Sequence, residues 1–263
     1  MKAVPARRLA RVVAAFAVVW LAARMRAPRL AREERRDLAR RLARRALASL
    51  DVQIRVCGRL RAADPSLVVA NHVSWLDIQV LNAVFGARFV AKDETSSWPV
   101  IGAIARGFET FFLRRGSRRD AARVMAAVAS ALAAGDTVVV FPEGTTTDGT
   151  RLGRFHPAFF QAALNAQVPL RPVGIRYTTA DGEQSLAASF IGDMTFLDSL
   201  LAILRERPLI AELRAGDVLT HERATRRALA ASAQACIGRE LGIPVDRIET
   251  SVGVPASRHK AAA

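Results

Sequence analysis

The sequence is poor in the residues that build disulfide frameworks, metal centres and nucleic-acid-binding surfaces. Its 263 residues include two cysteines, Cys57 and Cys236, which are too sparse for a disulfide framework or a zinc site and fit a reducing compartment. The four histidines are scattered without ligand spacing, so we expect no metal. Aromatic residues make up only 6% of the chain, which argues against the stacking surfaces that bind nucleic acid.

Lysine is also scarce, so arginine carries the basic charge. Only three of the 39 basic residues are lysine, and the formal net charge is +15. Residues 1–50 hold fourteen basic and three acidic residues, a net +11, which leaves +4 for the rest. Such charge favours an anionic partner, either nucleic acid or a membrane. Because the arginines flank an apolar segment and form no recognised nucleic-acid-binding motif, we expect a membrane with anionic lipids and no nucleic acid.

The sequence lacks an apolar run long enough to cross a bilayer unaided. Residues Val12 to Ala23 have no polar side chain, but as a helix they cover about 18 Å, whereas a bilayer core is about 30 Å thick. If Arg11 and Arg24 snorkel, the segment Leu9 to Met25 is still at the short limit. We therefore expect a half-inserted or interfacial helix. A cleaved signal peptide is the alternative, and the arginines after the run disfavour it.

Residues 28–50 place leucines and alanines at helical spacing, with arginines on the other face. The pattern predicts a basic amphipathic helix on anionic head groups, and a solvated surface helix is the alternative. We accordingly divide the chain into membrane-associating helices over 1–50, a main domain over 51–250 and a flexible tail over 251–263.

From residue 51 onward, short apolar runs alternate with helical stretches. This is typical of an α/β domain, here with a mixed, largely parallel sheet flanked by helices. Strands are predicted at 53–57, 67–70, 88–91, 110–113, 137–141, 170–177 and 189–191. Helices are predicted at 76–85, 118–134, 157–166, 196–205 and 222–241.

The segment Asn71 to Asp77 reads Asn-His-Val-Ser-Trp-Leu-Asp and follows a predicted strand, at the sheet edge where α/β proteins present functional groups. In one continuous helix His72 and Asp77 would lie about 140° apart, so the histidine must precede the helix. Ser74 is then the expected N-cap, and Asp77 lies in the first turn, able to point back to His72. The pair fits a general base with an orienting carboxylate, although Ser-x-x-Asp is also a capping box.

This segment resembles the Asn-His-x-x-x-x-Asp motif of the glycerolipid acyltransferase family, which includes lysophosphatidate-forming and related lysolipid acyltransferases. Three further stretches resemble the family in order and spacing, namely Lys92 to Arg115, Phe141 to Thr145 (Phe-Pro-Glu-Gly-Thr) and Val168 to Val173, so that the resemblance covers roughly residues 51–177. It implies His72 as the base and Asp77 as the residue that orients it. It also implies an acyl thioester of coenzyme A or acyl carrier protein as donor substrate, with no cofactor.

The resemblance further implies an acceptor site. Arg115 takes the arginine of the family's Phe-Ile-x-Arg and is expected to contact the acceptor head group. Glu143 is expected to bind the polar head, with Gly144 and Thr145 beside it, since glycine lets backbone approach a ligand. The run from Val168 to Val173 is expected to form part of the acyl-binding wall.

Two positions depart from the family pattern. Glu109 stands where many members carry glycine, so the local turn is expected to differ. Thr146 stands where many phosphate-acceptor members carry arginine, and Asp148 lies nearby. Losing a cation and gaining a carboxylate leaves two acceptors open: 1-acyl-sn-glycerol-3-phosphate, giving phosphatidate, and lyso-ornithine lipid.

These observations together predict an O-acyltransferase at the cytoplasmic face of the inner membrane. Backbone N–H groups of residues 73–75 are the expected oxyanion donors. An acyl thioesterase that uses His72 with water and a non-catalytic basic membrane-binding protein are the alternatives. A serine nucleophile at Ser74 is disfavoured, because the sequence has no Gly-x-Ser-x-Gly elbow.

Overall fold

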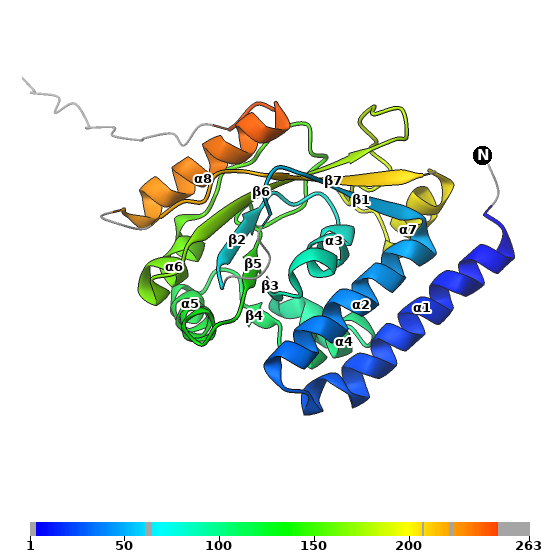
Figure 1. The fold of residues 1–263 in the computed structure, drawn as a ribbon, viewed down its shortest axis with the longest axis horizontal. Helices are drawn as coiled ribbons and strands as arrows, with labels where there is room; N and C mark the ends of the chain where they lie inside the picture. Colours follow the sequence, from blue (N-terminus) through cyan, green and yellow to red (C-terminus); the bar gives the residue numbers. More distant parts are fainter. Residues whose placement is uncertain (1–3, 61–64, 207, 221–223, 247–263) are drawn as a thin grey trace, which may run out of the picture.

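The computed structural model describes residues 4–60, 65–206, 208–220 and 224–246, and Figure 1 shows a sheet between layers of helices. The strands are β1 (Val52–Cys57), β2 (Leu67–Ala70), β3 (Arg88–Lys92), β4 (Phe111–Leu113), β5 (Val138–Val140), β6 (Leu170–Thr178) and β7 (Leu209–Ala215). The α-helices are α1 (Ala6–Met25), α2 (Arg32–Leu50), α3 (Leu76–Phe85), α4 (Ile101–Gly107), α5 (Arg118–Ala133), α6 (Gln161–Ala166), α7 (Phe196–Arg205) and α8 (Arg226–Leu241). Short 3₁₀ turns are η1 (Ala27–Arg29), η2 (Asp93–Ser97) and η3 (Pro157–Phe160).

The described strands form one seven-stranded sheet in the order β1-β7-β6-β2-β5-β3-β4. Neighbouring strands are parallel, except that β6 and β7 are antiparallel. The predicted α/β class with a mixed, largely parallel sheet is confirmed. Five adjacent strands, β6, β2, β5, β3 and β4, run the same way, so their carboxyl ends meet at one edge of the sheet, the carboxyl edge.

Two hydrophobic clusters occupy the two faces of this sheet, and β2 shows how the sequence divides between them. Val68 and Ala70 belong to the cluster under α2, α3 and α7, whereas Leu67 and Val69 belong to the cluster under α5, α6 and α8. Successive side chains of a strand point to opposite faces. Because both faces are covered, all four residues are apolar and fully buried, as expected of a central parallel strand.

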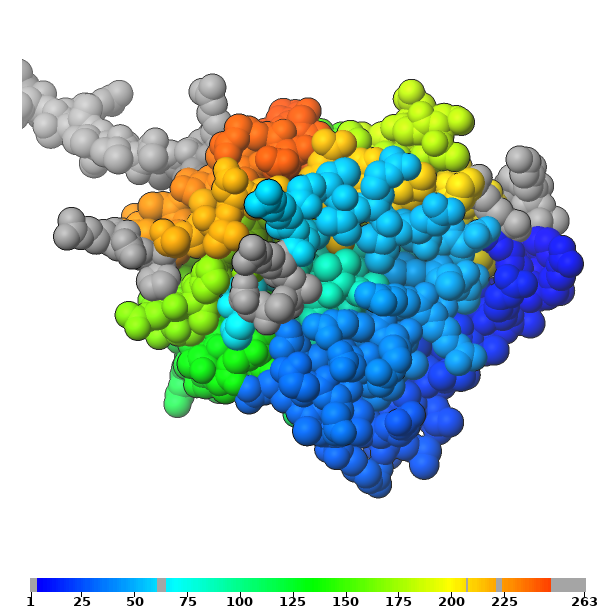
Figure 2. Space-filling model, in the orientation of Figure 1, coloured from blue at the N-terminus to red at the C-terminus, as the bar shows by residue number. Residues whose placement is uncertain are grey.

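The N-terminal helices pack on the first of these faces. α2 lies against α3, and α1 lies against α2 and α4; Figure 2 shows α2 directly against the rest of the chain with α1 along its outer side. At the α1–α4 crossing a Cβ on Gly107 would lie 2.2 Å from the Ala23 carbonyl oxygen, so only glycine permits this approach. α1 is 20 residues long. Among the described residues, no helix combines the length and apolarity needed to traverse a bilayer.

α1 nevertheless has an apolar outer face. Its inner face buries Val12 and Val19, while Val13, Leu21 and Met25 are exposed. The expectation that residues 9–25 lie half-inserted or in a membrane interface stays a prediction.

The structure departs from the predicted elements at three places. The predicted strand at 189–191 does not join the sheet; instead the Phe190 N–H donates to the Val73 carbonyl, beside the Asn-His segment. The last strand is β7, which was not predicted because Glu212 interrupts its apolar run. Helix α4 was also missed. The start of the predicted helix at 222 and the tail over 251–263 lie outside the described residues.

Buried Glu212 is compatible with a sheet interior because three guanidinium groups surround it. Its carboxylate pairs with Arg55 at 3.0 Å, Arg176 at 2.7 Å and Arg214 at 3.1 Å. Burial raises the Glu212 pKa, but the hydrogen bonds from Arg176 and Arg214 outweigh burial and leave the pKa below its usual value.

Glu109, where family members often carry glycine, keeps the backbone geometry of a glycine. Its φ is 55°, in the left-handed region that glycine favours. The expectation that the local turn differs from that of the family stays a prediction. The Glu109 carboxylate pairs with Arg35 at 2.8 Å.

Candidate active site

The residues singled out by the sequence gather at the carboxyl edge of the sheet. His72 follows β2, Glu143 follows β5, Lys92 ends β3, and Arg115 follows β4. The register pairs Val69 with Val140, which brings the ends of β2 and β5 side by side. Chain segments up to 71 residues apart in sequence therefore meet in one region.

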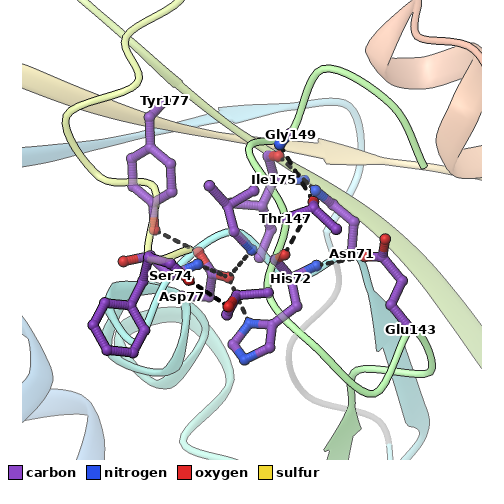
Figure 3. A network of polar contacts seen from close by, with 12 residues as sticks. Asn71, His72, Ser74, Asp77, Glu143, Thr147, Gly149, Ile175 and Tyr177 are labelled. Atoms are coloured by element: carbon purple, nitrogen blue, oxygen red, sulfur yellow. Dashed lines mark hydrogen bonds and ion pairs between the residues drawn. The ribbon is translucent and has the colours of Figure 1, made fainter. Parts of the chain in front are cut away.

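His72 and Asp77 form a hydrogen-bonded pair at this edge. His72 Nδ1 lies 2.8 Å from Asp77 Oδ2, and Figure 3 shows the imidazole turned back towards the carboxylate. The Asp77 side chain is fully buried, whereas the His72 side chain is 18% exposed. The ring also stacks on Phe141, with centroids 3.9 Å apart. The carboxylate fixes one ring nitrogen, and the stacking fixes the ring plane, which leaves Nε2 as the nitrogen for chemistry.

The Asp77 carboxylate also organises the backbone that leads into α3. Besides His72, its Oδ2 accepts from the N–H groups of Val73 at 2.8 Å and Ser74 at 3.0 Å, while Oδ1 accepts from the Tyr177 hydroxyl at 2.6 Å. The prediction that N–H groups of residues 73–75 hold the oxyanion was wrong for Val73 and Ser74, because both already donate to Asp77.

Ser74 is not the N-cap predicted from the sequence. Helix α3 begins at Leu76 with Trp75 at the N-cap position and no side-chain capping bond. The Ser74 hydroxyl oxygen is buried and has no hydrogen-bond partner within the described part of the chain. Half of the capping box survives, since the Ser74 N–H donates to Asp77. The Asp77 carboxylate thus both caps the start of α3 and orients the His72 ring.

Glu143 has a different position from the one expected of a head-group ligand. Its Oε1 accepts from the His72 N–H and its Oε2 from the Gly153 N–H, both at 2.8 Å, and the residue is buried. Burial raises the Glu143 pKa, and these two hydrogen bonds oppose part of the rise. The carboxylate therefore joins the loop after β5 to the His72 backbone instead of projecting to an acceptor.

Arg115 is exposed and reaches the same loop. Its guanidinium donates to the Gly144 carbonyl oxygen, so the arginine lies next to the Phe-Pro-Glu-Gly-Thr segment, which ends at Thr145. Burial lowers the pKa of Lys92, and the nearby positive charge of Arg115 lowers it further. Two cations thus share this part of the edge.

The run from Val168 to Val173 leads into the centre of the sheet. β6 begins at Leu170 and pairs with β2, and Val168 and Leu170 pack in the cluster under α5, α6 and α8. The acyl-binding role expected from the resemblance stays a prediction.

Three residues that anchor the Asn-His segment were not predicted. Asn71 bridges to β6 by donating to the Ile175 carbonyl at 3.0 Å and accepting from its N–H at 2.7 Å. The Thr147 N–H donates to the His72 carbonyl at 2.8 Å. Tyr177 donates to Asp77 from 100 residues away. The available signals were the Asn of the motif and the fact that Tyr177 is the single tyrosine of the chain.

Trp75 ties this segment to two further helices. Its ring contacts Phe196 of α7 with centroids 4.8 Å apart and Phe16 of α1 at 6.1 Å, and its Nε1 donates to the Ser199 hydroxyl at 3.0 Å. The N-terminal helix therefore reaches the loop that carries His72.

An imidazole held by a buried carboxylate can take a proton from a bound hydroxyl or water. Among the described residues, no group of three or more His, Cys, Asp or Glu side chains is arranged to hold a metal ion.

Comparisons with known proteins bear directly on this geometry. A family model described as Acyltransferase matches residues 52–176. The lyso-ornithine lipid O-acyltransferase of Rhizobium meliloti is 36% identical over 205 residues, which cover 73% of this chain and 70% of that protein. The chain belongs to the acyltransferase family. The 1-acyl-sn-glycerol-3-phosphate acyltransferase of Neisseria gonorrhoeae is 40% identical over 151 residues, covering 57% of this chain and 59% of that protein.

The fold of this acyltransferase also matches a solved structure. The crystal structure of the 1-acyl-sn-glycerophosphate acyltransferase PlsC from Thermotoga maritima aligns over 90% of this chain and 95% of that one, with a TM-score of 0.63 at 20% identity. At that identity the likeness concerns the fold. The resemblance recognised from the sequence is confirmed, and the chain is an acyltransferase of lipid metabolism.

Proposed function

We propose that this acyltransferase moves a fatty acyl chain from a thioester to the free hydroxyl of 1-acyl-sn-glycerol-3-phosphate, which gives phosphatidate. The observation that carries the proposal is the His72–Asp77 pair, with Nδ1 fixed at 2.8 Å and the ring partly exposed. A lipid hydroxyl is barely ionised at neutral pH, so it needs such a base when it attacks.

The steps follow from this arrangement. His72 Nε2 takes the hydroxyl proton as the oxygen attacks the thioester carbonyl carbon, and Asp77 stabilises the imidazolium that forms. The tetrahedral intermediate then collapses, the carbon–sulfur bond breaks, and the proton passes from His72 to the departing thiolate. No covalent acyl-enzyme is required.

The phosphate acceptor is supported by the cations at the β3–β4 end of the edge. Lys92 and Arg115 lie near enough to each other that their charges interact unfavourably. A phosphate monoester carries nearly two negative charges near neutral pH and relieves that repulsion, and a guanidinium binds it in a bidentate manner. Arg115 is then the head-group ligand, with the backbone at Gly144 and Thr145 beside it.

Lyso-ornithine lipid is the second candidate acceptor, with the same mechanism. Thr146 stands where an arginine would favour phosphate, and Asp148 follows two residues later. The relative in Rhizobium meliloti carries the name of this activity. A carboxylate beside the site would favour an acceptor whose head group bears an ammonium.

The proposal includes a membrane partner on the cytoplasmic face of the inner membrane, with acyl-coenzyme A or acyl carrier protein as donor. A groove of about 470 Å³ between α1 and α4 supports it, since Trp20 and Pro99 line it together with Arg24 and Arg106. Within the described chain no carboxylate pairs with either arginine. Apolar and cationic groups on one surface suit anionic lipids.

The test is an acceptor panel with purified protein, an acyl thioester and a thiol-detecting reagent. We expect rapid thiol release and phosphatidate formation with 1-acyl-sn-glycerol-3-phosphate, and about 100-fold or more loss in His72→Ala, the usual contribution of a general base. Thermal unfolding of wild type and His72→Ala shows whether the fold is kept. Preference for lyso-ornithine lipid would select the second acceptor, and thiol release without any acceptor would indicate a thioesterase.

Comparing coenzyme A and acyl carrier protein thioesters in the same assay identifies the donor. Flotation with vesicles containing phosphatidylglycerol tests the membrane partner. Protein that stays unbound at low salt would contradict the membrane part of the proposal without affecting the reaction.

A further inference from the structure

Tyr177 places a buried hydroxyl on the carboxylate that orients the base. It lies on β6, on the sheet face covered by α3, and is only 2% exposed. Its hydroxyl donates to Asp77 Oδ1 at 2.6 Å, as Figure 3 shows. A buried hydroxyl needs a partner, and an ionised acceptor gives a short, strong hydrogen bond.

The two oxygens of Asp77 have different partners. Oδ2 accepts from His72 Nδ1 and from the Val73 and Ser74 N–H groups. Within the described part of the chain, Oδ1 has the Tyr177 hydroxyl as its one donor. The loop before α3 therefore fixes Oδ2, and Tyr177 on β6 fixes Oδ1. Tyr177 thus determines how the carboxylate is rotated about the Cβ–Cγ bond of Asp77.

We infer that Tyr177 is a positioning residue for acyl transfer, which holds Asp77 in the orientation that aligns His72 and limits how strongly the carboxylate attracts the proton on the imidazole. This inference rests on the proposed function. A hydroxyl that donates to one carboxylate oxygen withdraws negative charge from the other. Without it, Asp77 would bind the imidazolium more tightly, and His72 would release its proton less readily.

The hydroxyl stays protonated throughout the working range. Burial raises the Tyr177 pKa well above 10.0, and the neighbouring Asp77 charge raises it further. Tyr177 therefore donates to Asp77 near neutral pH and does not act as the acid or base itself.

The first test is Tyr177→Phe, which keeps the ring and removes the hydroxyl. We expect kcat to fall by about ten-fold, the effect of one hydrogen bond to a charged group, with the KM of both substrates unchanged. The acid limb of the kcat–pH profile should move to higher pH, because the imidazolium is then better stabilised. A variant with a wild-type profile and a kcat that falls only in proportion to the folded fraction would overturn the inference.

Thr178→Val is the matched control. Thr178 is the next residue on β6, fully buried, and its hydroxyl has no hydrogen-bond partner within the described chain. Removing this hydroxyl should leave kcat and its pH profile unchanged. If both variants shift the acid limb equally, the effect comes from packing of the strand, and the role of Tyr177 is refuted.

A second test uses the fact that Tyr177 is the single tyrosine in the 263 residues. If the protein is expressed with 3-fluorotyrosine and carries a purification tag that contains no tyrosine, position 177 is therefore the one that is modified. The more acidic phenol is a stronger donor, so the acid limb should move to lower pH, opposite to Tyr177→Phe. Shifts in the same direction would contradict the proposed charge withdrawal.

Wild-type turnover separates this inference from the proposed function. If wild-type protein shows no acyl transfer to any lysolipid, the proposed function fails. If wild-type protein is active while Tyr177→Phe and the fluorotyrosine protein match it at every pH, only the role of Tyr177 fails.

Discussion

The two halves of the carboxyl edge differ in how their polar groups are held. At the β2–β5 half, Asp77 and Glu143 are buried, and both oxygens of each carboxylate accept hydrogen bonds from within the fold. At the β3–β4 half, Arg115 is exposed and, among the described residues, donates to one carbonyl oxygen, that of Gly144; its charge repels that of Lys92.

This difference matches the two tasks of a transferase. A base must hold its geometry through every turnover, so its neighbours are buried and fully hydrogen-bonded, where each lost bond is costly. An acceptor site must release its product, so long cationic side chains that keep unused donors suit it better. Substitutions at the two halves should therefore change different kinetic constants.

The largest effect is expected from Asp77→Asn, at the buried half. The amide nitrogen cannot accept from His72 or the loop N–H groups, so the imidazole loses its orientation and the stabilisation of its charged form. We expect kcat to fall by about 10³- to 10⁴-fold with little change in KM, as in other His–Asp pairs.

Asp181→Asn, at an exposed carboxylate, is the control for Asp77→Asn. Thermal unfolding of both proteins shows whether the fold is kept. A folded Asp77→Asn enzyme with more than a tenth of wild-type kcat would mean that Asp77 only caps α3.

Arg115→Ala tests the exposed half and should have an intermediate effect. Losing a charge-assisted contact to phosphate should raise the acceptor KM by about 10- to 100-fold and leave the donor KM unchanged. Arg114→Ala is the control. Arg114 is the neighbouring residue in the sequence, and its Nε lies 3.7 Å from Asp93 Oδ2, so its guanidinium pairs with a carboxylate. An equal KM change in both variants would point to general charge attraction, and an unchanged KM in Arg115→Ala would exclude it as a head-group ligand.

Glu143→Gln should have the smallest effect on kcat and a measurable effect on stability. Glutamine can accept only one of the two N–H groups, so the free energy of unfolding should fall by about 1–3 kcal/mol at pH 4.5. Burial raises the Glu143 pKa above 4.5 in the folded state, so the folded protein holds this proton more tightly than the unfolded chain.

The sign of the pH dependence follows from that raised pKa. The proton-linked stability from Glu143 is present below pH 4.5 and is lost as pH rises through the folded-state pKa. Urea unfolding at pH 4.5 and pH 8 should thus show the wild-type advantage over Glu143→Gln shrinking at the higher pH. Glu183→Gln, at an exposed site, is the control. An advantage that grows with pH would contradict the raised pKa.

Local sequence patterns predicted most elements, and the exceptions have physical causes. The strand Leu67–Ala70 and the helices Leu76–Phe85 and Phe196–Arg205 have the predicted bounds, since apolar spacing alone marks them. β7 was missed because the charge on Glu212 is neutralised by arginines of β1 and β6 that only the fold brings near. Helix α4 was missed because its glycines are needed for close packing, not for a turn.

The sequence by itself determined that His72 precedes a helix while Asp77 lies inside it, because 3.6 residues per turn forbid their meeting within one helix. It also placed the chain in its family, through four segments in order. Only the tertiary structure decided what the carboxylates do. Asp77 is shared among His72, two backbone N–H groups and Tyr177, and Glu143 binds backbone instead of facing an acceptor. Hydrogen bonds are made between groups within about 3 Å, and spacing along the chain does not tell which distant strand brings a donor that close.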